Sequence, residues 1–129
     1  MRKYKILIVE DEQLLADITR MNFPADRFTA KVCYNGPDAL KEVTRDRPEL
    51  ILLDIMMPGM DGWEVLLKLK SNPKTSAIPI IMCTAKDGLV DVEKSFKYGA
   101  QAYVIKPIVF GKLLKKVAAI MNIEELLSV

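Results

Sequence analysis

The sequence predicts an α/β fold, an open sandwich in which helices cover both faces of a parallel sheet. Short apolar runs alternate five times with segments of helical spacing along the chain. The runs are apolar throughout, as strands buried on both faces are. The length of 129 residues suits a single domain, and neither an internal repeat nor a linker interrupts it.

Four apolar runs predict buried strands, and a weaker run predicts a fifth. Polar or turn-forming residues bound each run and limit it to the usual length of a strand. The four runs are residues 5–9, 50–54, 78–84 and 102–106, and the weaker run is residues 30–34. Parallel strands are joined by right-handed crossovers, so we expect helices between them.

The first two helices are predicted by apolar spacing and by proline. The apolar positions of the first helix are Leu14, Leu15, Ile18 and Met21. Pro24 should stop this helix, because proline lacks the amide hydrogen that a helix interior uses. The second helix should begin at Asn35-Gly36-Pro37, with Pro37 in the first turn, where proline is tolerated best.

Three further helices complete the alternation. Asp61-Gly62 should precede the third helix, and Ser71-Asn72-Pro73 should end it. The fourth should run over about residues 89–98 and end on Gly99, a typical left-handed cap, and its weak apolar face predicts loose docking. The apolar stripe of the last helix is Leu113, Leu114, Val117, Ile120 and Met121.

Histidine is absent from the sequence, which excludes several kinds of site. A Ser-His-Asp or Cys-His catalytic site and a histidine-ligated zinc are ruled out, and any phosphohistidine must belong to another protein. The two cysteines, Cys33 and Cys83, lie in different apolar segments without metal-type spacing. We expect both to be reduced thiols.

Charge is nearly balanced, with 19 basic and 17 acidic side chains, which gives no indication of nucleic-acid binding. The basic excess lies late, because residues 86–116 contain seven lysines and three acidic residues. The apolar run after the charged amino terminus is too short for an export signal, and no stretch approaches the roughly 18 apolar residues of a membrane span. We expect a cytoplasmic protein with no direct contact to membranes or nucleic acid.

Charged and hydroxyl side chains stand at the carboxyl ends of the predicted strands, where open α/β sheets bind ligands. These residues are Glu10, Asp11, Glu12, Asp54, Thr84 and Lys106. Three carboxylates in the first turn would repel a bare phosphate, so the site should bind a cation first. Oxygen ligands without histidine or a nearby cysteine favour Mg²⁺ or Mn²⁺ over zinc.

Asp54 is the hardest of these residues to explain by structure alone. It interrupts an apolar run, where a carboxylate costs several kcal/mol unless a charged group compensates. Glu10 and Asp11 are ambiguous by themselves, because acids at a helix start also cap it and complement its dipole. Thr84 could equally satisfy a loop. Lys106 is more informative, since the proline after it forces a turn there, where a cis bond would be unsurprising.

Four motifs together resemble the receiver domain of bacterial two-component response regulators. They are residues 6–12 (ILIVEDE), 54–62 (DIMMPGMDG), 84–85 (TA) and 99–107 (GAQAYVIKP). The resemblance implies a flavodoxin-like fold, a five-stranded parallel sheet in the order 2-1-3-4-5 with five helices on its two faces. It also implies that residues 1–129 form one receiver domain, with no output domain in this chain.

The resemblance also implies a chemical role for the acids. Asp54 would accept a phosphoryl group from a histidine kinase, a histidine phosphotransfer protein or a small acyl phosphate. Glu10, Asp11 and Asp54 would hold Mg²⁺ or Mn²⁺ together with the backbone carbonyl of Met56. The protein would therefore catalyse only its own phosphorylation and dephosphorylation, and it would not be an enzyme acting on other substrates.

The remaining implied roles concern switching. Lys106 would pair with the phosphoryl oxygens, and Thr84 would move to them and draw Tyr103 inward. The face of the fourth helix, fifth strand and fifth helix would then change and control a downstream protein, for which its lysines suit an acidic partner. A merely solvated basic face is an equally simple interpretation of those lysines.

Some positions depart from the family pattern or tune it. Met56 and Lys86 occupy the two positions that set the rate of phosphate loss in the family. An apolar Met56 cannot orient a hydrolytic water, so we expect the phosphorylated state to outlast minutes. Residues 23–26 replace the usual continuous first helix, which should make that helix short and alter the surface that faces the kinase.

Three alternatives remain. A magnesium-dependent phosphatase with an aspartyl nucleophile usually carries a second acid two residues after the nucleophile, where this chain has Met56, and a cap domain. A flavin-binding electron carrier of the same architecture is disfavoured by the acidic first turn. The chain could also be the receiver fragment of a longer regulator.

Overall fold

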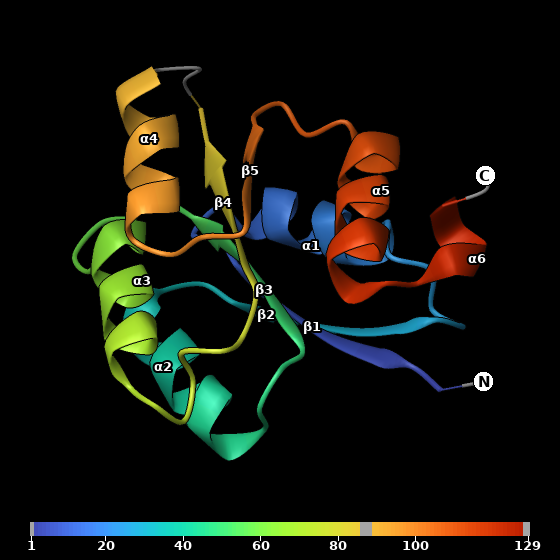
Figure 1. The fold of residues 1–129 in the computed structure, drawn as a ribbon, viewed down its shortest axis with the longest axis horizontal. Helices are drawn as coiled ribbons and strands as arrows, with labels where there is room; N and C mark the ends of the chain where they lie inside the picture. Colours follow the sequence, from blue (N-terminus) through green and yellow to red (C-terminus); the bar gives the residue numbers. More distant parts are fainter. Residues whose placement is uncertain (1, 86–88, 128–129) are drawn as a thin grey trace.

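The computed structural model describes residues 2–85 and 89–127 and has the predicted architecture (Figure 1). Five parallel strands form one sheet in the order β2-β1-β3-β4-β5, which confirms the fold class and strand order. The strands are β1 (Tyr4–Val9), β2 (Phe28–Cys33), β3 (Leu50–Asp54), β4 (Ile80–Thr84) and β5 (Ala102–Ile105). The helices are α1 (Gln13–Met21), α2 (Gly36–Arg45), α3 (Gly62–Ser71), α4 (Leu89–Lys97), α5 (Phe110–Met121) and α6 (Glu124–Leu127).

Alternate residues of the central strands enter two separate cores, one on each face of the sheet. In β1, Leu7 and Val9 join the core that packs on α2 and α3, whereas Ile6 and Ile8 join the core that packs on α5. Figure 1 shows α2, α3 and α4 on one side of the sheet and α1, α5 and α6 on the other. Because β3 and β4 are buried along their whole length, the carboxyl ends of the strands are held on a rigid platform.

The predicted caps and turns lie where the sequence placed them. The Asn35 side chain accepts a hydrogen bond from the Asp38 amide at the start of α2, and the Asp61 side chain accepts one from the Glu64 amide at the start of α3. Gly99 has a φ of 99° two residues after the last residue of α4. These local contacts confirm the predicted starts of α2 and α3 and the predicted end of α4.

Helix α1 is short, as predicted, but it ends earlier than Pro24. The backbone and side-chain amides of Asn22 both donate to the carbonyl of Ile18, which closes the last turn. The apolar spacing correctly predicts a helix but does not identify the face that packs on the sheet, because Leu14 is 75 % exposed and Met21 is 74 % exposed. Small buried residues of α1 pack on the sheet instead, which leaves an apolar stripe on the surface.

Several strand bounds and one helix differ from the predictions. β1 begins one residue earlier than predicted, and β2 and β5 each end one residue earlier. β2 begins at Phe28 rather than residue 30, because the buried Phe28 pairs with Tyr4. β4 begins at Ile80 rather than residue 78, because the Ile78 amide donates to Thr75 in the preceding turn. Helix α6 was not predicted, since its four residues are too few to show a period.

No helix in the described part of the chain is long and apolar enough to cross a membrane. Cys33 and Cys83 are free thiols, as the sequence predicted. Burial raises the pKa of both thiols, which keeps them in the protonated form.

Candidate functional site

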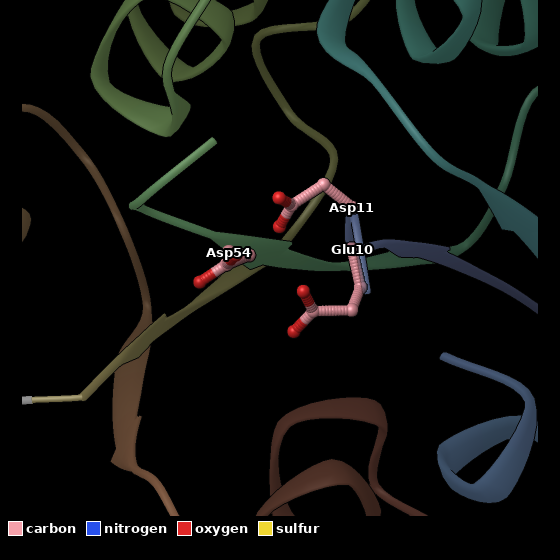
Figure 2. Close-up of side chains that lie close together, drawn as sticks. All are labelled: Glu10, Asp11 and Asp54. Atoms are coloured by element: carbon pink, nitrogen blue, oxygen red, sulfur yellow. The ribbon is translucent and has the colours of Figure 1, made fainter. Parts of the chain in front are cut away.

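The carboxyl ends of β1 and β3 bring three carboxylates together (Figure 2). Glu10 and Asp11 directly follow β1, and Asp54 is the last residue of the neighbouring β3. One oxygen of each carboxylate lies within 4.8 Å of the others. Glu10 is 5 % exposed and Asp54 is 3 % exposed, so two of the three charges are removed from water.

The backbone fixes Asp54 at this position from two sides. The amide of Ile55 donates to the Cys83 carbonyl of β4 at 3.0 Å, and the amide of Gly62 donates to the Ile55 carbonyl at 2.9 Å. A β-carbon on Gly62 would lie 2.3 Å from the carbonyl oxygen of Asp54, so only glycine allows the start of α3 to approach this closely.

Lys106 joins the acids from the end of β5. Its Nζ donates to Oε1 of Glu10 at 2.6 Å and to Oδ1 of Asp54 at 3.0 Å. The second carboxylate oxygen of Glu10 accepts a hydrogen bond from the Glu12 amide at 3.1 Å. The Lys106–Pro107 peptide bond is cis. One ammonium therefore contacts two of the three carboxylates of the cluster.

The charges of the site are unbalanced. Burial raises the pKa of Glu10 to about 7. The hydrogen bond from Lys106 opposes this rise, and the negative charge of Asp54 adds to it. Burial also raises the pKa of Asp54, again against Lys106. Burial alone would lower the pKa of Lys106, but its hydrogen bonds to both acids outweigh burial and raise it. With all three acids ionised, the cluster holds more negative charge than one ammonium offsets.

The donor set fits a small, hard divalent cation. Three carboxylates within 4.8 Å supply oxygen ligands, and the described residues place no histidine or thiolate among them. Mg²⁺ prefers oxygen ligands and usually retains several waters, so the protein needs to supply only some of its ligands. The residues present here are therefore suited to Mg²⁺.

Thr84 and Tyr103 lie on neighbouring strands beside this cluster. Thr84 ends β4 and is 3 % exposed, and its carbonyl accepts a hydrogen bond from the Lys106 amide at 2.7 Å. In the register of β4 and β5, Tyr103 pairs with Met82, two residues before Thr84. Tyr103 and Thr84 therefore share one face of the sheet. The Tyr103 ring meets Phe96 of α4 edge to face, with centroids 6.0 Å apart.

Met56 and Lys86 are the two residues predicted to set the rate of phosphate loss. Met56 lies in the loop after Asp54, and it is 64 % exposed. Lys86 lies outside the described residues. A groove of about 540 Å³ includes Met56, Asp61 and Trp63 in its lining.

Sequence reasoning missed two contacts near the site. Gly62 was interpreted only as part of a helix start, although glycine in a first helical turn already signalled a close approach. Trp63 packs against the core, and Nζ of Lys94 lies 4.4 Å from its ring centroid. That contact joins α3 to α4 and involves residues 31 positions apart, which no local pattern predicts.

Comparison with known proteins agrees with the geometry. A family model for the response regulator receiver domain matches residues 6–118. The response regulator PleD of Caulobacter vibrioides is 39 % identical over 104 residues, which are 81 % of this chain and 23 % of PleD. The chain thus spans less than a quarter of the length of the curated relatives it matches.

Solved structures show the same fold. A response regulator from Chloroflexus aurantiacus has a TM-score of 0.88 at 25 % identity, covering 94 % of this chain and 99 % of that one. A CheY-like receiver domain protein from Methanospirillum hungatei has a TM-score of 0.86 at 27 % identity, covering 96 % and 98 %. Chemotaxis protein CheY4 of Vibrio cholerae, at 22 % identity and a TM-score of 0.85, shares the fold over 92 % of this chain and 98 % of its own. The chain belongs to the family of receiver domains of two-component response regulators.

Proposed function

We propose that this protein accepts a phosphoryl group on Asp54. The observation that carries the proposal is the Asp54 carboxylate, 3 % exposed and 3.0 Å from the Lys106 ammonium, at the edge of a sheet where ligands bind. A buried carboxylate beside two other acids is costly for stability alone. The Asp54 carboxylate lies between the acids that would hold a cation and the Lys106 ammonium. Positive charge on both sides suits a reaction that brings a negatively charged group to Asp54.

The reaction follows from the chemistry of the groups. A carboxylate oxygen of Asp54 attacks the phosphorus atom of a phosphohistidine on a partner protein. A new P–O bond forms while the P–N bond breaks, and the electron pair leaves with the imidazole of the partner. The partner must supply the histidine, because this chain contains none.

Lys106 and Thr84 would stabilise the transferred group. The Lys106 ammonium already contacts the Asp54 oxygen at 3.0 Å, so it can remain beside the phosphoryl oxygens as charge develops on them. Thr84 ends the strand between β3 and β5, and its hydroxyl could reach the same oxygens. A shift of Thr84 would then open space on the face that Tyr103 shares.

Glu10, Asp11 and Asp54 would hold Mg²⁺ or Mn²⁺, together with the backbone carbonyl of Met56. When bound, the ion supplies positive charge that neutralises the carboxylates and the phosphoryl oxygens. Glu10 must give up the proton that its raised pKa retains before it can act as a ligand. Asp11 is the most exposed of the three acids and forms the open side of the site.

The kinase or phosphotransfer partner would dock beside α1. A groove of about 470 Å³ runs there, and Leu15 and Ile18 of α1 and Phe110 of α5 are among its lining residues. Leu14, Ile18 and Met21 form an exposed apolar stripe on the same helix, 75 %, 40 % and 74 % exposed. Lys106 also lines this groove, so a partner histidine that docks here would approach the site residues directly.

The output surface would be the face of α4, β5 and α5. A groove of about 290 Å³ between β5 and α5 is lined by Ile105, Val109, Lys112 and Lys116 among others. Phe96, Ile105 and Val109 are 51 %, 41 % and 57 % exposed, so apolar patches alternate with lysines on this face. An amphipathic, acidic protein segment has the complementary chemistry.

The decisive experiment is mass spectrometry after incubation with acetyl phosphate, with and without Mg²⁺. We expect one added phosphoryl group that requires the metal and is absent from Asp54→Asn. Asp61→Asn is a matched control, because Asp61 caps α3 nearby and should leave the added mass intact. Phosphorylation of Asp54→Asn to the same extent, or labelling of the wild type at another residue, would contradict the proposal.

A further inference from the structure

One ion pair before helix α5 and one ion pair after it connect the helix to strands β1 and β2. Before α5, Lys106 contacts Glu10 at 2.6 Å, at the carboxyl end of β1. After α5, Glu125 of α6 forms an ion pair with Arg27, at the amino end of β2. Figure 1 shows α6 near the start of β2, at the opposite end of α5 from the β5–α5 connection. The two ties therefore lie at opposite ends of the parallel strands.

The Arg27 side of this contact is buried, whereas the Glu125 side chain is half exposed. Arg27 is 7 % exposed, its carbonyl accepts a hydrogen bond from the Tyr4 amide at 2.9 Å, and its amide donates to Pro24 at 3.0 Å. Among the described residues its Nε has no hydrogen-bond partner. A guanidinium this buried depends on its carboxylate partner, so Glu125 holds α6 against the segment between α1 and β2.

The turn into α6 is equally well fixed. Asn122 adopts the left-handed conformation with a φ of 58°, and the Ile123 amide donates to the Ala118 carbonyl at 2.8 Å. Ile123 is 1 % exposed and belongs to the core that includes Phe23 and Phe28. An apolar anchor and an ion pair thus secure the same short helix from two sides.

One partner of this second tie, Glu125, lies outside the residues that the family model matches. The family match ends at residue 118, before α6 begins. Arg27 directly follows residues 23–26, where the sequence departs from the continuous first helix that the resemblance implies. The residue after this departure thus contacts the segment beyond the family match, through the Arg27–Glu125 ion pair.

We propose that α6 and Arg27 form a pivot for α5. The inference rests on the proposed function, because a phosphoryl group on Asp54 would compete with Glu10 for the Lys106 ammonium and loosen the tie at the start of α5. The Arg27–Glu125 tie takes no part in that chemistry and stays closed. The start of α5 then moves while its end stays fixed, about 18 Å away for a helix of 12 residues.

Amide hydrogen exchange on the full chain tests the pivot, with Mg²⁺ and beryllium trifluoride as the probe for a phosphoryl group on Asp54. In the wild type we expect exchange over residues 108–113 to change at least about threefold, whereas exchange over residues 119–126 changes far less. Equal responses at the two ends would overturn the pivot. A probe that raises the melting midpoint without changing exchange in α5 would also overturn it.

A variant separates the pivot from the site. Glu125→Gln without any ligand should raise exchange over residues 22–28 and 119–126 severalfold while the Mg²⁺-induced melting shift stays as in the wild type. Glu124→Gln is the matched control, because the described residues include no ion pair to Glu124, and it should behave like the wild type. Unchanged exchange in Glu125→Gln would overturn the pivot. If the probe fails to raise the melting midpoint of the wild type, the proposed function is wrong, and the proposed motion of α5 is wrong with it. The exchange of Glu125→Gln still shows in that case whether the Arg27–Glu125 ion pair holds α6 in place.

Discussion

Gly62 stands against the backbone of Asp54 so closely that a β-carbon on residue 62 would lie 2.3 Å from the Asp54 carbonyl oxygen and 2.7 Å from the α-carbon of Ile55. Both neighbours are backbone atoms of the β3 end, which cannot rotate away as a side chain would. The first residue of α3 thereby fixes the height at which the Asp54 carboxylate leaves the sheet.

Gly62→Ala should therefore destabilise the protein by about 3 kcal/mol or more, because the new methyl group must displace the segment that carries Asp54. Gly111→Ala is the matched control. It also replaces a helical glycine, but nothing lies within 4 Å of its β-carbon position, and it should stabilise by about 0.5–1 kcal/mol. Urea unfolding of both variants measures the difference, and equal effects would contradict the close approach.

Mg²⁺ binding should strengthen as the pH rises toward about 7. Glu10 has its pKa raised from 4.5 to about 7, so between these values the metal-free folded protein holds a proton that the unfolded chain has released. The stability of the metal-free protein falls as the pH rises through this window. Mg²⁺ displaces that proton, so its apparent affinity should rise by up to about tenfold per pH unit over the same window.

Thermal melts at millimolar Mg²⁺, run at about pH 6 and about pH 8, measure this effect. The increase in melting midpoint should be larger at the higher pH in the wild type. Glu10→Gln removes the titrating group and should abolish the difference between the two pH values. A wild-type melt that Mg²⁺ leaves unchanged at the higher pH would count against the metal site.

Met56→Asn should shorten the lifetime of the phosphorylated state. The wild-type side chain is apolar and 64 % exposed, so it cannot hold a water in position for attack. A carboxamide can hydrogen-bond such a water, and we expect loss of the phosphoryl group at least about tenfold faster. Timed mass spectrometry measures the decay, with a wild-type lifetime beyond minutes.

Met21→Asn is the control for that measurement, because Met21 is 74 % exposed on α1 and away from Asp54. It should decay at the wild-type rate. Loss within seconds in the wild type, or equal rates in all three proteins, would show that Met56 does not limit hydrolysis.

Asp46 should protect the fold against acid. Its carboxylate accepts hydrogen bonds from Lys5 at 2.7 Å and from Lys31 at 2.9 Å, and these hydrogen bonds lower the pKa of Asp46 to about 2. The contribution to stability is present above the ordinary pKa of 3.8 and is lost as the pH falls from there to about 2. Asp46→Asn should flatten the pH dependence of the melting midpoint in this window.

Asp26→Asn provides the comparison, since Asp26 is exposed and the described residues form no ion pair with it. Its acid melting curve should match that of the wild type. If Asp46→Asn melts like the wild type at every pH, the two lysines do not stabilise the carboxylate in solution.

The fold was predictable because its signals are local. A parallel sheet covered by helices buries both faces of strongly apolar strands such as residues 50–54. Asn35 begins a helix and Gly99 ends one, each through contacts within a few residues. The juxtaposition of Glu10, Asp54 and Lys106 was also accessible, because parallel strands bring their carboxyl ends to one edge.

Other features depend on contacts between distant residues and left no local pattern. Arg27 gave no sign of its burial, because its partner Glu125 lies 98 positions away. The inner face of α1 was also hidden, since small residues fill it and Leu14 and Met21 remain outside. Spacing reveals which residues could share a face, but only the packed sheet decides which face turns inward.

The contact between Lys94 and Trp63 gives the protein a built-in optical signal. Trp63 is the only tryptophan in the chain, and the ammonium 4.4 Å from its ring belongs to α4. Indole emission is sensitive to a nearby charge, so its intensity and colour depend on where that helix rests. A fluorimeter can therefore detect a change in the position of α4 relative to α3 in real time, on the unlabelled protein.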